Sequence, residues 1–222
     1  MKSKGGTTLY MMKELHNLTR RAALGAGAAL TLAIAFSSPA RADQAAETFM
    51  SGILTEANIV FEAQDEQTRL DGIETLVNKY VDMKRVAMWV LGQYARQITD
   101  AQKEEYFPLF RRYATLVYQE ALVDYSGQRL EIVNSVDRSP RDIIVNTRFS
   151  NLKPNDQYAD VTVHWRVYRD GDGEMSIFDA GANGVWLAIE QQSQFKSVIA
   201  NNGGGTAGID ALIADLKAKL AG

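Results

Sequence analysis

The chain has 222 residues, no cysteine and a formal net charge of −3, and because its first 42 residues hold six basic residues and one acidic residue, residues 43–222 carry −8. This acidic balance argues against nucleic acid as a partner and against binding to anionic membranes through bulk charge. The absence of cysteine excludes a disulfide framework, so the hydrophobic core alone must stabilise the fold.

Residues 1–42 have the features of an export signal. A basic stretch ending at Arg21 is followed by the charge-free segment Ala22–Ala40 and by Ala40-Arg41-Ala42, which has the small-x-small form of a cleavage site. Only the 15 residues of Ala22–Phe36 are strongly apolar, which is short of the roughly 20 that a membrane span needs. We therefore predict a signal peptide cleaved after about Ala42, and a single domain over residues 43–222.

The signal contains the pair Arg20-Arg21 before a weakly apolar segment, which is a pattern typical of twin-arginine export. Signals of the general secretory route can carry two arginines as well. The export route therefore stays open, although both routes lead out of the cytoplasm.

Helical periodicity dominates residues 44–125. Apolar side chains in the opening segment recur at steps of three and four: Phe49, Ile53, Ala57 and Val60. Further helices are predicted around Arg69–Tyr80 and over Val81–Leu91. The longest helix should begin at Thr99, where Thr99 and Gln102 form a capping-box pattern. It should end near Tyr125-Ser126-Gly127, with a kink or a break at Pro108 because proline removes an amide donor.

The next part of the chain alternates between apolar and polar residues. Val161–Tyr168 is a clear strand, and the turn Asp170–Gly173 leads into a second strand, Glu174–Ala180. Arg129–Val136 and Asp142–Phe149 precede them, so four strands should form a meander.

Two helices should close the chain, over Val185–Ala200 and over the segment that ends at Leu220, separated by the glycines after Asn202. The predicted fold class is α+β. It is a curved four-stranded antiparallel sheet, NTF2-like or cone-shaped, with about six to seven helices packed mainly on one face around an apolar cavity.

Reactive chemistry is sparse. His164, the single histidine after residue 42, lies on the polar face of its strand, and no Gly-x-Ser-x-Gly elbow exists. Zinc would need clustered His and Cys, and Asp170–Glu174 is better explained as a hairpin turn than as a calcium loop. We expect neither a metal nor a cofactor. Asp179 at a strand end either caps the next helix or acts as a general base in a cone-shaped pocket.

Two blocks of sequence resemble the MlaC family, the periplasmic auxiliary component of a toluene-tolerance-type ABC lipid transport system. The first block comprises Leu91-Gly92-Gln93-Tyr94, Thr99, Gln102, Glu105-Tyr106, Phe110-Arg111-Arg112, Tyr118, Leu122 and Tyr125-Ser126-Gly127. The second comprises Ile177-Phe178-Asp179, Gly184-Val185, Gln194-Phe195, Val198-Ile199, Gly203-Gly204, Leu212-Ile213 and Leu216. The doubled glycine and the style of the signal resemble alphaproteobacterial forms, whose relatives are also associated with hopanoids.

The chain departs from the family pattern at four bulky or charged positions. Many relatives have Trp in place of Ala95, Ser in place of Trp186, Arg in place of Gln192 and Trp in place of Met175. These departures leave the predicted fold intact but put the headgroup preference and the cavity shape in doubt.

The resemblance implies a periplasmic carrier that holds phospholipid acyl chains in a hydrophobic cavity and shuttles lipid between outer- and inner-membrane complexes, maintaining outer-membrane lipid asymmetry. Its implied partners are an inner-membrane ABC transporter with a substrate-binding ring subunit and an outer-membrane lipoprotein–porin complex, and we expect a monomer. The predicted lipid-binding residues are Trp89, Tyr94, Phe107, Phe110, Val117, Val163, Trp165, Val167 and Trp186. We expect Val163, Trp165 and Val167 of the sheet to face the aromatic residues of the helices across the lipid tails.

Three alternatives remain open. The cargo could be a hopanoid or another apolar ligand. The protein could instead be a cone-fold enzyme that uses Asp179 on a small hydrophobic substrate, or a structural adaptor of the transporter. Bound phospholipid would distinguish the carrier from the other two, and we predict that the protein is not an enzyme.

Overall fold

The computed structural model describes residues 43–122, 129–152, 156 and 158–221. The predicted signal peptide, its cleavage site and the predicted helix end at residues 125–127 lie outside these residues. Within the described part, no helix combines the length and the apolar character that crossing a membrane requires. The same residues form six α-helices, one 3-10 helix and five strands.

Three helices begin with an aspartate that caps the first turn. They are α2 (Gln44–Phe61), α3 (Glu66–Tyr80) and α4 (Met83–Val90). The carboxylate of Asp43 accepts from the amide of Ala46 at 2.9 Å, and Asp65 and Asp82 do the same in the next two helices. Each aspartate satisfies an amide that would otherwise lack a partner and places negative charge at the positive end of the helix.

The capping box predicted before the longest helix is confirmed. After the 3-10 helix η2 (Gly92–Arg96), Thr99 and Gln102 exchange hydrogen bonds of 3.1 and 3.2 Å at the start of α5 (Asp100–Leu122). The predicted break at Pro108 is absent, because α5 runs through this residue as one helix. Pro108 and the residue one turn before it, Glu104, both lie on the exposed side, where water can satisfy the carbonyl that proline leaves unpaired.

The sheet is antiparallel, with strands in the order of the chain. It contains β1 (Arg129–Ser139), β2 (Asp142–Ser150), β3 (Thr162–Arg169), β4 (Met175–Ala182) and β5 (Val185–Trp186). The four predicted strands are confirmed, but the prediction missed β5. Asn183 and Gly184 have φ values of 51° and 84°, which suit a tight hairpin turn and return Val185-Trp186 onto β4. The two C-terminal helices are α6 (Leu187–Asn201) and α7 (Gly205–Leu220).

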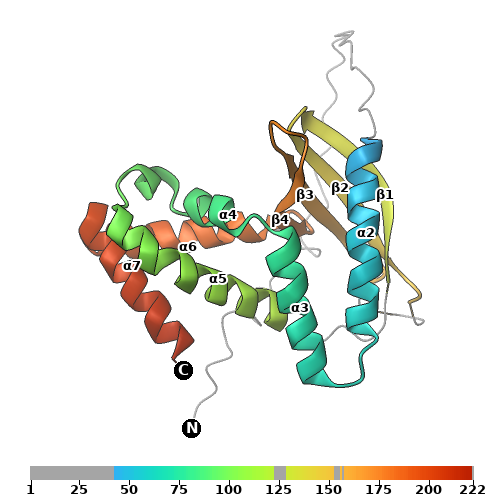
Figure 1. Cartoon of the computed structure of the whole chain (residues 1–222), viewed down its shortest axis with the longest axis horizontal. Helices are drawn as coiled ribbons and strands as arrows, with labels where there is room; N and C mark the ends of the chain where they lie inside the picture. The colour runs from blue at the N-terminus through green and yellow to red at the C-terminus, as the bar shows by residue number, and fades with distance from the viewer. Residues whose placement is uncertain (1–42, 123–128, 153–155, 157, 222) are drawn as a thin grey trace, which may run out of the picture.

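The molecule has two hydrophobic cores, one on each side of β4. Ile177 belongs to the core between α2 and the sheet, and its neighbour Phe178 belongs to the core formed by α3–α7. Adjacent residues of a strand point to opposite faces, so helices cover both faces of β4, which differs from the predicted packing on one face. Figure 1 shows α2 lying along the sheet and α4–α7 gathered to one side. The NTF2-like shape and the apolar cavity stay predictions.

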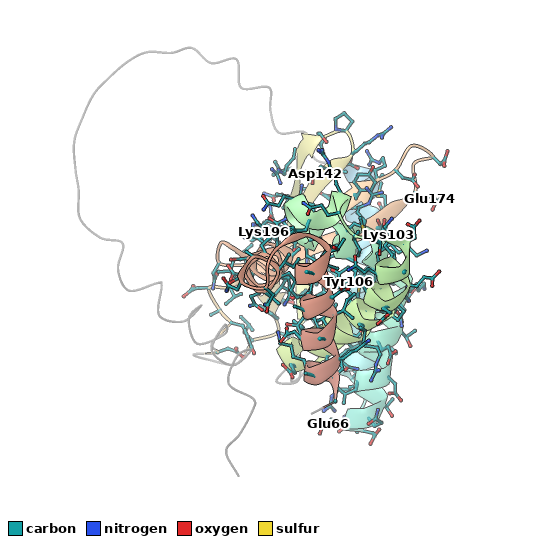
Figure 2. All side chains as sticks on the ribbon, turned by 90° about the vertical axis from the view of Figure 1, so that its left-hand side faces the viewer. Glu66, Lys103, Tyr106, Asp142, Glu174 and Lys196 are labelled. Carbon is teal, nitrogen blue, oxygen red and sulfur yellow. The ribbon has the colours of Figure 1, made fainter. Side chains whose placement is uncertain are left out.

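Polar contacts lock the helical part. The Tyr106 hydroxyl donates to the Ala87 carbonyl at 2.9 Å, and the Gln102 side chain donates to the Thr206 carbonyl at 2.9 Å. In the side view of Figure 2, Tyr106 lies in the middle of the helices, whereas Asp142 and Glu174 lie at one end of the molecule and Glu66 at the other. The helices beside the sheet are therefore held together by hydrogen bonds as well as by apolar packing.

Candidate functional site

The residues predicted to line one cavity fall into separate groups. Trp165 and Val167 belong to the core between α2 and the sheet, and Trp89, Tyr94, Phe107 and Phe110 belong to the helical core. Val163 shares the sheet face of Trp165, while Val117 is a half-buried residue of α5. The expected opposition of sheet and helix residues across one space is therefore not found, because two cores replace it.

The helix group is closely packed. Phe110 is 2% exposed and makes an edge-to-face contact with Phe195, with ring centroids 6.1 Å apart. Trp89 packs edge-to-face on Phe178 of the sheet at 5.6 Å. Aromatic pairs at these distances stabilise a core beyond their buried area. These side chains therefore join the helices to β4 and leave no space for a second molecule at their contacts.

The sheet face under α2 changes along its length. Near the β3–β4 turn it is sealed, since Ile143, Val145 and Val167 are completely buried. Farther along the same face the apolar side chains are only partly covered: Leu130, Ile132, Phe149, Val163 and Trp165. Two of the predicted residues, Val163 and Trp165, belong to this less covered half of the face.

Trp165 is oriented by a partly buried hydrogen bond. Its indole Nε1 donates to Thr147 Oγ1 at 2.9 Å, and the Thr147 hydroxyl donates to the Val163 carbonyl at 3.2 Å. Thr147 is fully buried, so these bonds satisfy polar groups that would be costly to leave unpaired. The Trp165 ring is only partly buried and packs against the core under α2. Sequence reasoning did not identify Thr147, whose role follows only from the strand register.

Trp186 lies on the other face of the sheet. Its ring is 5.9 Å from that of His164, the neighbour of Trp165 in β3, and adjacent strand residues face opposite ways. It also covers Gly181, where an added Cβ would come within 2.9 Å of the indole. The structure thus places Trp186 away from Trp165, and the two cannot border the same space without a rearrangement.

The face that carries Trp186 is polar, as predicted for His164. The His164 Nδ1 lies 2.6 Å from Asn146 Oδ1, and the Asn146 amide donates to Asn134 Oδ1 at 2.6 Å. Desolvation lowers the pKa of His164. Arg166 on the same face forms a two-bond ion pair with Asp142. These contacts link three strands through side chains and leave His164 with a structural partner.

Asp179 joins β4 to α6. It is 1% exposed, and its Oδ1 accepts from the amides of Ala180 at 2.8 Å and Ala188 at 2.9 Å. The predicted capping of the next helix is confirmed, although Asp179 lies in β4, nine residues before the Ala188 amide that it accepts from. Desolvation raises the pKa of Asp179 to about 6, against the two amides and Arg166, which lower it.

A separate pocket of about 280 Å³ lies between the α3–α4 junction and the β3–β4 turn. Half of its lining residues are charged, and the Arg85 guanidinium lies 3.7 Å from the centre of the Tyr168 ring. Pockets for drug-sized ligands span about 300–1,000 Å³ and are mainly apolar, so this one does not suit two acyl chains. Among the described residues no group of three or more His, Cys, Asp or Glu could hold a metal ion.

Comparison with known proteins gives the family. The family model described as MlaC protein matches residues 53–218, which is most of the chain. The chain belongs to the MlaC family. The matched segment begins inside α2 and ends inside α7, so it includes residues of both hydrophobic cores.

Two relatives extend the comparison. The intermembrane phospholipid transport system binding protein MlaC of Haemophilus influenzae is 27% identical over 188 residues, which cover 83% of each chain. A solved structure of a phospholipid-binding protein from Ralstonia solanacearum, in complex with a phospholipid, is similar with a TM-score of 0.64. This likeness spans 80% of the present chain and 99% of the other, at 21% identity, and therefore shows that the MlaC fold is shared.

Proposed function

We propose that this protein carries phospholipid through the periplasm between outer- and inner-membrane complexes, with the acyl chains held on the less covered half of the α2 sheet face. Membership of the MlaC family supports the carrier role, together with the name of the Haemophilus relative and the phospholipid in the Ralstonia structure. The observation that carries the location is the row of partly covered apolar side chains around Trp165.

The physical demand on such a carrier is large. Two acyl chains expose about 30 methylene groups, and each costs about 0.8 kcal/mol to keep in water. A carrier must therefore cover the tails almost completely, while the headgroup can stay in solvent. This task needs apolar surface and no reactive side chain. The candidate catalytic carboxylate, Asp179, instead accepts two backbone amides through its Oδ1.

The structure refines the predicted lining. We propose that Val163 and Trp165 contact the tails, with Leu130 and Ile132 beside them. Val167 and Phe110 are closed off, so they would contact lipid only if α2 or the helices moved. Trp89, Tyr94 and Phe107 belong to the helical core on the other side of β4, so they and Val117 of α5 are left out of the proposed lining. Trp186 is left out because it lies on the opposite face.

The test is to purify the mature protein from a bacterial periplasm and to analyse it by native mass spectrometry and organic extraction. Phospholipid in equal molar amount is expected, and a hopanoid in its place would identify the alternative cargo. An empty protein would contradict the carrier function.

A pair of neighbouring substitutions locates the tails. Val163→Glu places a charge on the proposed lining and should remove the copurifying lipid, because burying an unpaired carboxylate beside the tails is costly. Thr162→Glu is the matched control, since Thr162 is also half-buried but faces the other way, opposite Arg148. Equal lipid content in both variants would contradict this location.

We also propose that the loaded protein, as a monomer, docks on an inner-membrane ABC transporter through its ring subunit and on an outer-membrane lipoprotein–porin complex. Photocrosslinking in cells from exposed positions such as Ile59 and Ile189, which are 69% and 47% exposed, should give adducts with both complexes. Adducts with neither complex from any exposed position would contradict these partners.

A further inference from the structure

The backbone nitrogen of Asp43 is held by a polar site that joins α2 to the sheet. The Asp43 amide donates to the Ser135 hydroxyl of β1 at 2.7 Å, and that hydroxyl donates in turn to Glu47 Oε1 of α2 at 2.7 Å. Ser135 is 3% exposed, and Glu47 is half-buried. An amide has one hydrogen and needs one acceptor, so its hydrogen bonding does not explain the carboxylate that lies one hydroxyl farther on.

The charges at this site do not balance. The Asp43 carboxylate accepts from Arg169 Nη2 of β3 at 2.8 and 2.7 Å, and the two side chains are only 11% and 24% exposed. No ion pair joins Glu47 to a basic residue of the described part of the chain. Two carboxylates therefore share one guanidinium. Because a half-buried acid without a cation is unfavourable, the site lacks one positive charge.

Asp43 is also the first residue after the predicted cleavage site. Ala40-Arg41-Ala42 has the small-x-small form that signal peptidases cleave after. Hydrolysis of the C–N bond between Ala42 and Asp43 consumes one water, leaves a carboxylate on Ala42 and converts the amide nitrogen of Asp43 into an α-ammonium group. The new group carries one positive charge and three hydrogens, and it arises at the nitrogen that Ser135 already holds.

We propose that Ser135 and Glu47 form a binding site for the α-ammonium group of Asp43 that removal of the signal peptide creates, and that this site fixes the start of α2 to the sheet in the processed protein. The ammonium group donates to Ser135 Oγ as the amide does, and Glu47 supplies the opposite charge one hydroxyl away. The Asp43 carboxylate stays with Arg169, so two acids and two cations then balance.

The place of the site at the start of a helix makes the acids necessary. The first turn of a helix carries partial positive charge, which disfavours an ammonium group there. Asp43 caps this turn through the Ala46 amide, and Glu47 lies within the turn. Ser135 pairs with Val145 of the sealed end of the α2 core, and α2 lies along the sheet from this point (Figure 1). The ammonium group is therefore expected to depend on Glu47 for its stabilisation, and that dependence is measurable.

The first measurement is the mass of the intact protein recovered from the periplasm after the whole chain is expressed with its signal. The mass should correspond to a chain that begins at Asp43. A processed chain that begins at any other residue overturns the proposal, because its ammonium group would not be on the nitrogen that Ser135 holds.

The second measurement is the melting temperature of four proteins. The processed protein is compared with a protein that carries four glycines before Asp43, which keeps the amide for Ser135 but lets the ammonium group move up to roughly 13 Å away. Each of the two is made with and without Glu47→Gln. This substitution should lower the melting temperature by about 2–4 °C more in the processed protein than in the extended one, as expected when neighbouring groups interact in a domain of this size.

A second variant and a control complete the test. Ser135→Ala removes the hydroxyl between the two charges, so it too should lower the melting temperature more in the processed protein than in the extended one. Glu62→Gln is the matched control, because Glu62 lies at the other end of α2 in an exposed ion pair with Arg129 and should have the same effect in both proteins. Equal effects of Glu47→Gln in the two proteins, or an equal excess for Glu62→Gln, overturn the ammonium site.

Discussion

At the scale of single residues, Asp179 is the least ordinary group in the protein. It caps α6 from the neighbouring strand, a task that Ser, Thr or Asn could perform without burying a charge. The carboxylate is nevertheless 1% exposed, and desolvation outweighs the amides and Arg166, so its pKa rises from 3.8 to about 6. The protein therefore pays a stability cost at neutral pH to keep an acid at this junction.

This cost gives a pH prediction. Below pH 4 Asp179 is protonated in the folded and the unfolded protein, and above pH 6 it is ionised in both. Between these limits the folded protein binds more protons, so the contribution of Asp179 to the free energy of unfolding falls as pH rises, by about 3 kcal/mol in all. Asp179→Asn lacks this term. Denaturant unfolding measures the difference in the free energy of unfolding between Asp179→Asn and the unaltered protein. This difference should shift by about 3 kcal/mol in favour of the variant between pH 4 and pH 7.

The comparison of the two proteins is necessary because other groups oppose this trend. The pKa of Asp43 is lowered, despite some desolvation, by its hydrogen bonds to Ala46 and Arg169, which makes the protein more stable as pH rises through the acidic range. Asp43 titrates equally in both proteins and cancels in the difference. Parallel pH profiles for the two proteins would contradict the assignment of a raised pKa to Asp179.

At the scale of secondary structure elements, close contact between helices α6 and α7 depends on a missing side chain. An added Cβ at Gly208 of α7 would lie 2.3 Å from the Ile199 carbonyl oxygen of α6, whereas the Cβ of an alanine at Gly52 of α2 would meet nothing within 4 Å. The same substitution should therefore have opposite effects in the two helices.

Gly208→Ala should destabilise the protein by about 1–3 kcal/mol, because overpacking at a backbone contact forces the helices apart. Gly52→Ala should stabilise it by about 0.5–1 kcal/mol, since alanine is the better helix former. Thermal unfolding of the two variants side by side measures both signs. A stabilising Gly208→Ala would show that α6 and α7 are not packed as closely as the structure has them.

Much of this element structure could be predicted from the sequence, because period and capping are local signals. Thr99 and Gln102 marked the start of α5, and the alternation of Val161–Tyr168 marked β3. The strand β5 was missed because Val185 and Trp186 are too few to show a period and run directly into α6. The site was less predictable. Periodicity shows that Val167 and Phe110 are buried, but it does not show that they lie in two different cores.

At the scale of the whole molecule, the two cores meet around β4, at the start of α4 and where α2 packs on α3. The amide of Asp82 donates to the Ile177 carbonyl at 3.1 Å, Trp89 packs on Phe178, and Asp179 caps α6. The core under α2 is thus bounded by a sealed end at this junction and a less covered end around Trp165. A ligand that covers the open end adds apolar contacts to the smaller core and should stabilise the folded chain as a whole.

Removal of bound lipid should therefore lower the melting temperature and change the fluorescence of one tryptophan. A ligand present at about 100 times its Kd stabilises a protein by about 3 kcal/mol, or roughly 5–10 °C for a domain of this size. The chain has three tryptophans, so variants that keep only Trp165 or only Trp186 report on opposite faces of the sheet. Delipidation should shift the emission of Trp165, which then faces water, and leave that of Trp186 unchanged. A shift confined to Trp186 would indicate that the lipid binds on the face of His164. If neither tryptophan shifts and the melting temperature is unchanged, the proposal that lipid binds the open sheet face is wrong.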